Sequence, residues 1–300
     1  MPFQRYAAPG PFRVLAERDV WHDQSRQRDL PCKHYLPQGG GATPLILFSH
    51  GLGGDRESGE RWLHHWASHG YRCLALQHGG SDSAAMAGSP MALRRLLAAA
   101  TTPEHSLARI ADIRYVLDEV VRRQGADDSW ARVDLGRLAL AGHSYGAVTT
   151  QSMAGERRIY GPPVVEPRLA AFLALSPSAR GEELPLGARF AGIDRPFFCI
   201  TGTRDHGIGW NDIRAADRLL PYRHLPPGEK YQLVLEGAAH MPLAGNGGNR
   251  HLLAPPLASA IAAASLAFWE ATLWRRREAR RWLRQDFPAT LSPGDLWEFK

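Results

Sequence analysis

The chain has 300 residues, of which 44% are hydrophobic and 22% charged, and its net charge at pH 7 is +6. This composition is typical of a soluble globular protein with a large core and excludes a chain that is disordered throughout. No repeat, linker or low-complexity tract divides the sequence, so we expect a single domain over residues 1–300.

The first predicted elements are two irregular segments, residues 13–20 and 32–36, which we expect to pair antiparallel at the edge of a sheet. Apolar runs then predict strands at 45–49 and 71–77. Between these two runs, residues 60–69 have the spacing of an amphipathic helix. The chain therefore begins as an edge pair followed by a β/α/β unit.

A longer helix is predicted over residues 107–123, where isoleucines, valines and a leucine form one stripe. Four further apolar runs predict strands at 138–141, 171–175, 197–201 and 231–235. These runs are apolar throughout, as a parallel sheet covered on both faces requires. We therefore predict an α/β fold with a mostly parallel, doubly wound, eight-stranded sheet and helices on both faces.

Two C-terminal segments are predicted to be helices. Residues 252–269 carry no charge, but they are rich in Ala and Ser and include Pro255 and Pro256, so we expect a core helix and no membrane span. Residues 274–284 contain six arginines interleaved with apolar side chains. We expect the solvated face of a helix there and no nucleic-acid partner, because such a partner needs a wider basic footprint.

The cysteines and the N-terminus indicate the compartment. Cys32, Cys73 and Cys199 form no C-x-x-C pair, so we expect buried free thiols and no disulfide or metal site. The N-terminus lacks the apolar region of a signal peptide, which predicts a cytoplasmic location.

Two long connections, residues 81–102 and 176–195, follow predicted strands. A doubly wound sheet places its ligand site beyond the carboxyl ends of its strands. Each connection is interpreted either as a cap over such a site or as a surface loop without function.

Residues 142–146 read Gly-His-Ser-Tyr-Gly and directly follow the predicted strand 138–141. A G-x-S-x-G pattern at a strand end is typical of a nucleophile elbow, a sharp turn that holds a serine hydroxyl above the sheet edge. The flanking glycines avoid collisions that a Cβ would cause. The pattern predicts Ser144 as a nucleophile, with a simple glycine-rich turn as the alternative.

A serine hydroxyl is a weak nucleophile and needs a histidine base that a carboxylate orients. In this kind of sheet the expected chain order is serine, acid, histidine, each after a strand. Asp205 follows the strand predicted at 197–201, and His240 follows the strand predicted at 231–235. The spacing therefore predicts a triad of Ser144, Asp205 and His240.

Two rivals for these roles are weaker. Asp212 follows the same strand as Asp205 but falls in a predicted helix at 211–220, and His206 precedes the last strand, which violates the chain order.

An acyl-transfer site also needs N–H donors that stabilise the oxyanion. Residues 50–54 read His-Gly-Leu-Gly-Gly and follow the strand predicted at 45–49. The N–H groups of Leu52, in this turn, and of Tyr145, after the nucleophile, are the predicted donors.

Predicted substrate contacts are less determined. Tyr145, Trp210 and Met241 adjoin the catalytic positions and offer apolar surface, while His78 and Asp82 are candidates for the mouth of the site. The alternative for each is packing within a loop.

The chain resembles the α/β-hydrolases, and within them the serine-bearing group described as predicted dienelactone hydrolases, similar also to platelet-activating-factor acetylhydrolases. The resemblance covers nearly all of the chain. Its motifs are residues 21–23, 26–31, 49–54, 77–82, 112–118, 142–146, 201–205, 235–240 and 297–300. It implies a Ser-His-Asp hydrolase without a cofactor and carries these roles onto Ser144, His240 and Asp205.

The resemblance also limits which reactions we expect of this chain. Strict dienelactone hydrolases carry a cysteine, and haloalkane dehalogenases and epoxide hydrolases an aspartate, where this chain has Ser144. We expect a serine hydrolase that cleaves small or medium carboxylic esters through an acyl-enzyme intermediate. A lipase, polyester, thioester or lactone hydrolase uses the same triad, and a non-catalytic binding protein of this fold is the alternative of another class. Neither the acyl group nor the oligomeric state is predicted.

Overall fold

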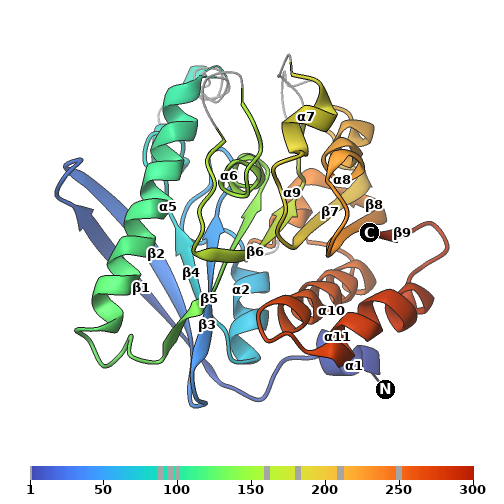
Figure 1. Cartoon of the computed structure of the whole chain (residues 1–300), viewed down its shortest axis with the longest axis horizontal. Coiled ribbons are helices and arrows are strands. Elements are labelled where there is room, and N and C mark those ends of the chain that lie inside the picture. Colours follow the sequence, from blue (N-terminus) through green and yellow to red (C-terminus); the bar gives the residue numbers. More distant parts are fainter. Residues whose placement is uncertain are drawn as a thin grey trace.

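The computed structural model describes residues 2–86, 91–92, 98, 102–158, 163–179, 184–207, 213–247 and 252–300. Within them, nine strands form one mixed sheet in the order β1-β2-β4-β3-β5-β6-β7-β8-β9 (Figure 1). Neighbouring strands from β4 to β8 in this order pair parallel with one another, whereas β1 with β2, β2 with β4, and β8 with β9 pair antiparallel. The protein is therefore an α/β fold with a mostly parallel sheet.

All six apolar runs are strands. They are β3 (Thr43–Ser49), β4 (Arg72–Leu76), β5 (Val133–His143), β6 (Leu169–Leu175), β7 (Phe197–Arg204) and β8 (Lys230–Ala239). Every residue of β3 and β4 is buried, as expected of strands that are covered on both faces. The parallel strands end at one edge of the sheet, so the loops that follow them meet there.

The predicted antiparallel edge pair is confirmed as β1 (Val14–Asp23) and β2 (Arg28–Pro37). The predicted number of eight strands is wrong, because β9 (Leu296–Phe299) pairs antiparallel with β8 at the other edge. This short strand is only partly buried and has no long apolar run, so it lacks the pattern of the core strands. It is anchored by Trp297, whose ring stacks on Tyr231 with centroids 5.6 Å apart.

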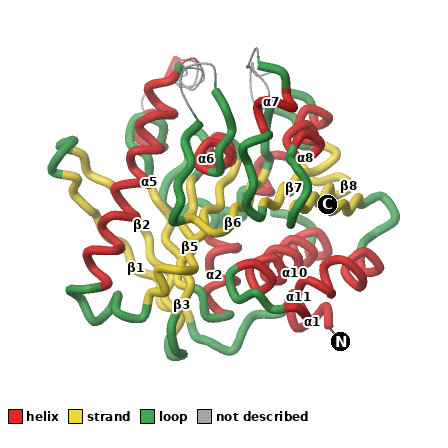
Figure 2. Tube along the Cα trace, in the orientation of Figure 1, coloured by secondary structure: helices red, strands yellow, loops and turns green. Residues whose placement is uncertain are grey.

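Helices cover both faces of the sheet (Figure 2). Side chains of β3 alternate between two apolar cores, with Ile46 and Phe48 in one and Leu45 and Leu47 in the other. The first core is closed by α1 (Pro2–Ala7), α2 (Glu60–Ser68), α10 (Pro255–Thr272), α11 (Arg277–Arg281) and the π-helical turn η2 (Trp282–Asp286). The second is closed by α5 (Pro103–Gln124), α6 (Tyr145–Met153), α7 (Leu186–Phe190) and α8 (Leu220–His224).

Shorter helical turns complete the chain. They are α3 (Ser83–Met86), η1 (Ala215–Leu219), α9 (His240–Leu243) and η3 (Phe287–Thr290). Residues 211 and 212 of the helix predicted over 211–220 lie outside the described residues, and the described part becomes helical only at Ala215, where the 3-10 turn η1 leads into α8.

Both predicted C-terminal helical segments are present. Helix α10 begins at Pro255 and is largely buried, and no helix among the described residues has the length and hydropathy to cross a membrane. The arginine-rich segment forms α11 and η2, which bury Ala279, Trp282 and Leu283. All three cysteines are buried and free.

The two long connections are described only in part. Residues 87–90, 93–97 and 99–101 of the first, and 180–183 of the second, lie outside the described residues. The prediction of a cap is therefore tested for neither connection.

Candidate active site

Ser144 lies at the sharp turn between β5 and α6. Its backbone has φ 55° and ψ −114°, which is strained for a residue with a Cβ. A Cβ at Gly142 would overlap the carbonyl oxygen of Gly146, and one at Gly146 would overlap that of Ser49. The glycines of the pentapeptide are therefore required by close backbone contacts, as the sequence predicts.

The structure brings the three predicted triad residues together. The Nε2 atom of His240 lies 2.9 Å from the Oγ of Ser144, and its Nδ1 lies 2.6 Å from Oδ1 of Asp205. The three residues come from the ends of β5, β7 and β8. Asp205 is fully buried and His240 is 7% exposed. The serine hydroxyl is thus linked through one imidazole to a carboxylate shielded from water.

Asp205 is held in its charged form. Burial alone would raise its pKa, but the hydrogen bond from His240, the Arg218 charge and the Thr201 hydroxyl lower that pKa to about 2. Thr201 donates to Oδ2 over 2.7 Å, and the Nε of Arg218 lies 3.4 Å from Oδ1. An ionised carboxylate only accepts hydrogen bonds, so Nδ1–H of His240 donates to it and Nε2 accepts from Ser144.

Arg218, in η1, is a further member of this group and carries no recognisable sequence motif. It is 3% exposed and donates to the backbone carbonyls of Asp205 over 3.3 Å and Ser176 over 3.0 Å. Its Nη2 lies 3.2 Å from Nδ1 of His240, but both atoms carry protons, so this is a packing contact. One arginine in a short helical segment gives no sequence signal that would have found it.

The rivals do not join the group. The His206 side chain is exposed, and Asp212 lies outside the described residues.

His143 fixes the backbone of the triad histidine. Its Nε2–H donates to the carbonyl oxygen of His240 over 3.0 Å, and the two rings lie 4.7 Å apart. Burial, with the nearby His240, lowers the pKa of His143 to about 3, so it stays neutral at physiological pH. The variable position of the pentapeptide is therefore a positioning residue, which the short pattern cannot reveal.

The glycine turn at residues 50–54 lies against Ser144. A Cβ added to Gly51 would be 3.3 Å from the Cβ of Ser144, and the turn is closed by Gly54 N–H donating to the Gly51 carbonyl over 3.0 Å. Among the described residues, no acceptor takes the Leu52 N–H. Helix α6 begins at Tyr145, so the positive end of its dipole also lies beside Ser144.

The structure does not place His78 at the mouth of the site. It is fully buried, with Nδ1 3.0 Å from Oδ2 of Asp112 and Nε2 2.9 Å from the Oγ of Ser49. Burial and the nearby Arg109 lower the pKa of His78 to about 4, so the ring is neutral. Its Nδ1–H donates to the carboxylate and its Nε2 accepts from Ser49. The ring thus supports the glycine turn from inside the protein.

Arg109 supports the same turn. This buried guanidinium donates to the carbonyl of His50 over 2.7 Å and to the Oγ of Ser81 over 2.9 Å. Its Cζ lies 4.4 Å from the centre of the Tyr145 ring, a cation–π contact. Burial lowers the pKa of Arg109 to about 10, which still leaves it charged at neutral pH. One side chain therefore joins the glycine turn to the residue that follows Ser144.

Asp112, on α5, ties this region to the edge hairpin. Its fully buried carboxylate accepts from Arg26 over 2.7 Å and from Arg28 over 2.8 Å, in addition to His78. Burial by itself would raise its pKa, but the hydrogen bond from His78 and the charge of Arg28 lower that pKa to about 2. The carboxylate is therefore ionised at neutral pH.

The remaining predicted contacts are partly described. Met241 is half-buried in α9, next to His240, and Trp210 lies outside the described residues. Asp82 is buried, where it accepts from the side chain of Gln77 over 2.8 Å.

A scan of protein-family models found none that matches this chain, and a search of curated proteins found no match either.

Proposed function

We propose that this chain has the α/β-hydrolase fold and is a serine hydrolase that cleaves carboxylic esters through an acyl-enzyme intermediate. One observation carries the proposal, the hydrogen-bonded series from Ser144 through His240 to Asp205, with distances of 2.9 and 2.6 Å. The strained backbone of Ser144 and its position at the end of a parallel strand support it further.

In the proposed first step, Nε2 of His240 takes the hydroxyl proton while Oγ of Ser144 adds to the acyl carbonyl carbon. The imidazolium that forms is stabilised by the ionised Asp205. The carbonyl oxygen becomes an oxyanion, for which we propose the backbone N–H groups of Leu52 and Tyr145 as donors. A single donor of this kind typically contributes about 3 kcal/mol of transition-state stabilisation.

In the second half, the oxyanion reforms the carbonyl and expels the alcohol, which takes the proton from His240. A water molecule then gives a proton to the same nitrogen and attacks the acyl group on Ser144. Collapse releases the carboxylic acid and restores the serine hydroxyl. Met241 and Trp210 are proposed contacts of the acyl group, which favours small or medium apolar acyl chains.

A fluorophosphonate probe tests the chemistry directly. We expect the intact protein to gain the mass of one phosphonyl group on Ser144, because only an activated serine displaces the fluoride. The Ser144→Ala variant should fold, gain no label, and hydrolyse p-nitrophenyl esters several orders of magnitude more slowly. Folded wild-type protein that takes no label would contradict the proposal and favour a non-catalytic binding protein.

The acyl group is tested with p-nitrophenyl esters of rising chain length beside a thioester and a lactone. We expect the highest kcat/KM on short to medium esters. A preference for the thioester or the lactone would keep the triad chemistry but overturn the proposed substrate class.

A further inference from the structure

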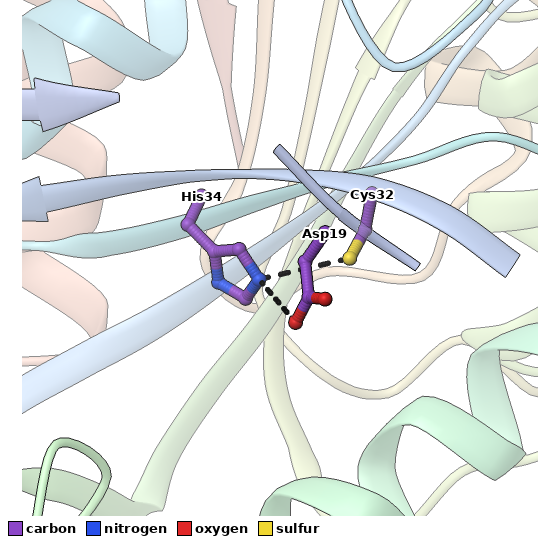
Figure 3. A group of neighbouring side chains, drawn as sticks. All are labelled: Asp19, Cys32 and His34. Carbon is purple, nitrogen blue, oxygen red and sulfur yellow. Dashed lines mark hydrogen bonds and ion pairs between the residues drawn. The ribbon is translucent and has the colours of Figure 1, made fainter. Parts of the chain in front are cut away.

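A second cluster of chemically capable side chains lies on the antiparallel pair at the sheet edge. Asp19 is on β1, and Cys32 and His34 are on β2, two residues apart and therefore on one face. Asp19 is the direct cross-strand partner of Cys32. Figure 3 shows the carboxylate, thiol and imidazole turned toward one another. We refer to Asp19, Cys32 and His34 as the hairpin group.

The distances within the hairpin group suit ligands around a shared centre. Nε2 of His34 lies 3.6 Å from Sγ of Cys32 and 3.7 Å from Oδ2 of Asp19, and all three ligand atoms lie within 4.8 Å of one another. The nitrogen-to-oxygen distance is too long for a direct hydrogen bond. In tetrahedral zinc sites the metal lies about 2.3 Å from sulfur and about 2.0–2.1 Å from nitrogen, which sets those two ligands about 3.5 Å apart.

The same atoms do not suit a cysteine nucleophile. A Cys-His-Asp relay needs the thiol on one ring nitrogen and the carboxylate on the other. Here both approach Nε2, and Nδ1 of His34 has no hydrogen-bond partner among the described residues.

The ligand atoms are held in place before any ion arrives. The Trp21 indole N–H donates to Oδ2 of Asp19 over 2.7 Å, and the Val20 N–H donates to Oδ1 over 2.8 Å. The Trp21 and Trp130 rings pack against His34, with centroids 5.9 and 5.7 Å from it. The Asp19 side chain is 43% exposed, so an ion and its remaining water ligand have a path to solvent.

We propose that Asp19, Cys32 and His34 bind one zinc-type divalent ion, with water as the fourth ligand. Sulfur and imidazole ligands favour Zn²⁺ or Co²⁺ over Mg²⁺ and Ca²⁺, which prefer oxygen. Binding releases the thiol proton to solvent, because the thiolate is the ligand. The ion then balances one carboxylate and one thiolate, so the filled site is neutral beside the Arg123 and Arg72 guanidiniums, which stack on Trp21 and Trp130.

The proposed metal site does not depend on the proposed hydrolase activity. In the sheet, β4 and β3 separate β2 from β5, which leads to Ser144. Protein that binds no ion can therefore still hydrolyse esters, and protein that hydrolyses no ester can still bind the ion.

Cobalt provides the test, because its spectrum reports its ligands. The untagged, metal-free protein is titrated with Co²⁺. We expect one equivalent to bind, with near-ultraviolet absorption from thiolate-to-cobalt charge transfer and the strong visible bands of a tetrahedral site, and Zn²⁺ to displace it. Cys32→Ala should remove the charge-transfer absorption. Cys73→Ala, which removes another buried thiol from a neighbouring strand, should keep it.

A second variant distinguishes the loss of a ligand from misfolding. Asp19→Asn keeps the shape of the side chain and should weaken Co²⁺ binding by at least about 10-fold, since even the loss of groups that support a ligand has this effect. Wild-type protein that binds no stoichiometric Co²⁺ would overturn the proposal. So would a Cys32→Ala variant that binds Co²⁺ with an unchanged spectrum.

Discussion

The triad and the hairpin group contain similar residue types but differ in how their atoms meet. In the triad, neighbouring polar atoms lie 2.6 to 2.9 Å apart, and each proton has a defined acceptor. In the hairpin group the corresponding distances to Nε2 of His34 are 3.6 and 3.7 Å. The first arrangement suits the proton transfer of the proposed hydrolysis. The second, in which the thiol but not the carboxylate lies within hydrogen-bond reach of the imidazole, suits the proposed ion.

The two groups also differ in which nitrogens the histidine uses. His240 contacts Ser144 and Asp205 through opposite ring atoms, as a proton relay requires. His34 presents one nitrogen to both Cys32 and Asp19. The two proposals therefore rest on the choice of ring nitrogen, because the residue types alone do not separate a nucleophilic site from a metal site.

The largest expected effect comes from Asp205→Asn. The amide can donate to Nδ1 of His240 and so favours the wrong tautomer, which should reduce kcat for ester hydrolysis by about 10⁴-fold. Steady-state kinetics on p-nitrophenyl acetate measures this, and Co²⁺ binding at the hairpin group should not change. An equal loss of both properties would contradict the separation of the two regions.

The next largest effect is expected from Asp112→Asn, because this buried carboxylate holds Arg26 and Arg28 of the edge hairpin and His78 beside the glycine turn. Removing its charge leaves Arg26 and Arg28 without their buried partner, which should cost about 3 kcal/mol of unfolding free energy at pH 7. Urea denaturation measures this. Wild-type stability within about 0.5 kcal/mol would show that the ion pairs contribute little.

The pH dependence of that variant gives a second measurement. The pKa of Asp112 in the folded protein, about 2, lies below the usual value near 4. Its contribution to stability is therefore complete above pH 4 and is lost as the pH falls toward 2. Wild-type protein should lose about 2 kcal/mol from this group in that window, and Asp112→Asn should lack this part of the slope. Identical slopes would contradict the assignment.

Sequence patterns predict most of the sheet, and they predict which three side chains meet at its edge, because both follow from local rules. Fully apolar runs identify strands covered on both faces, and the order of Ser144, Asp205 and His240 follows from the direction of parallel strands. Strand β9 was missed because an edge strand of four partly exposed residues has no such run.

The positioning residues and the hairpin group depend on contacts between distant segments. Arg218 reaches Asp205 only because η1 folds back over the end of β7, and no periodicity encodes that contact. Cys32 and His34 show a same-face spacing within one strand, a signal that the sequence contains. Asp19 joins them only through the register of β1 on β2, which the sequence analysis did not fix.

A smaller effect is expected from Arg218→Met, which tests how much the triad depends on its buried cation. Without the guanidinium, Asp205 loses a neighbouring charge and the Ser176 carbonyl loses its donor. We expect kcat/KM for p-nitrophenyl acetate to fall about 10-fold, the size of a 1.4 kcal/mol effect. Arg218→Lys should restore part of the rate because it keeps the charge. An equal loss of activity in both variants would show that Arg218 acts through its hydrogen bonds to the backbone and not through its charge.

The smallest effect on hydrolysis is expected from Cys32→Ala, which removes a member of the hairpin group and leaves the triad unchanged. Strands β4 and β3 lie between the hairpin group and β5, the strand that leads to Ser144. The loss of the thiol should therefore leave kcat/KM within about twofold of wild type. The same variant should lose the gain in thermal stability that Zn²⁺ gives the wild-type protein, because an ion that binds only the folded state stabilises it. Chelation of the metal from wild-type protein should lower its melting temperature and leave ester hydrolysis intact. A large loss of hydrolysis on chelation would contradict the separation of the two regions.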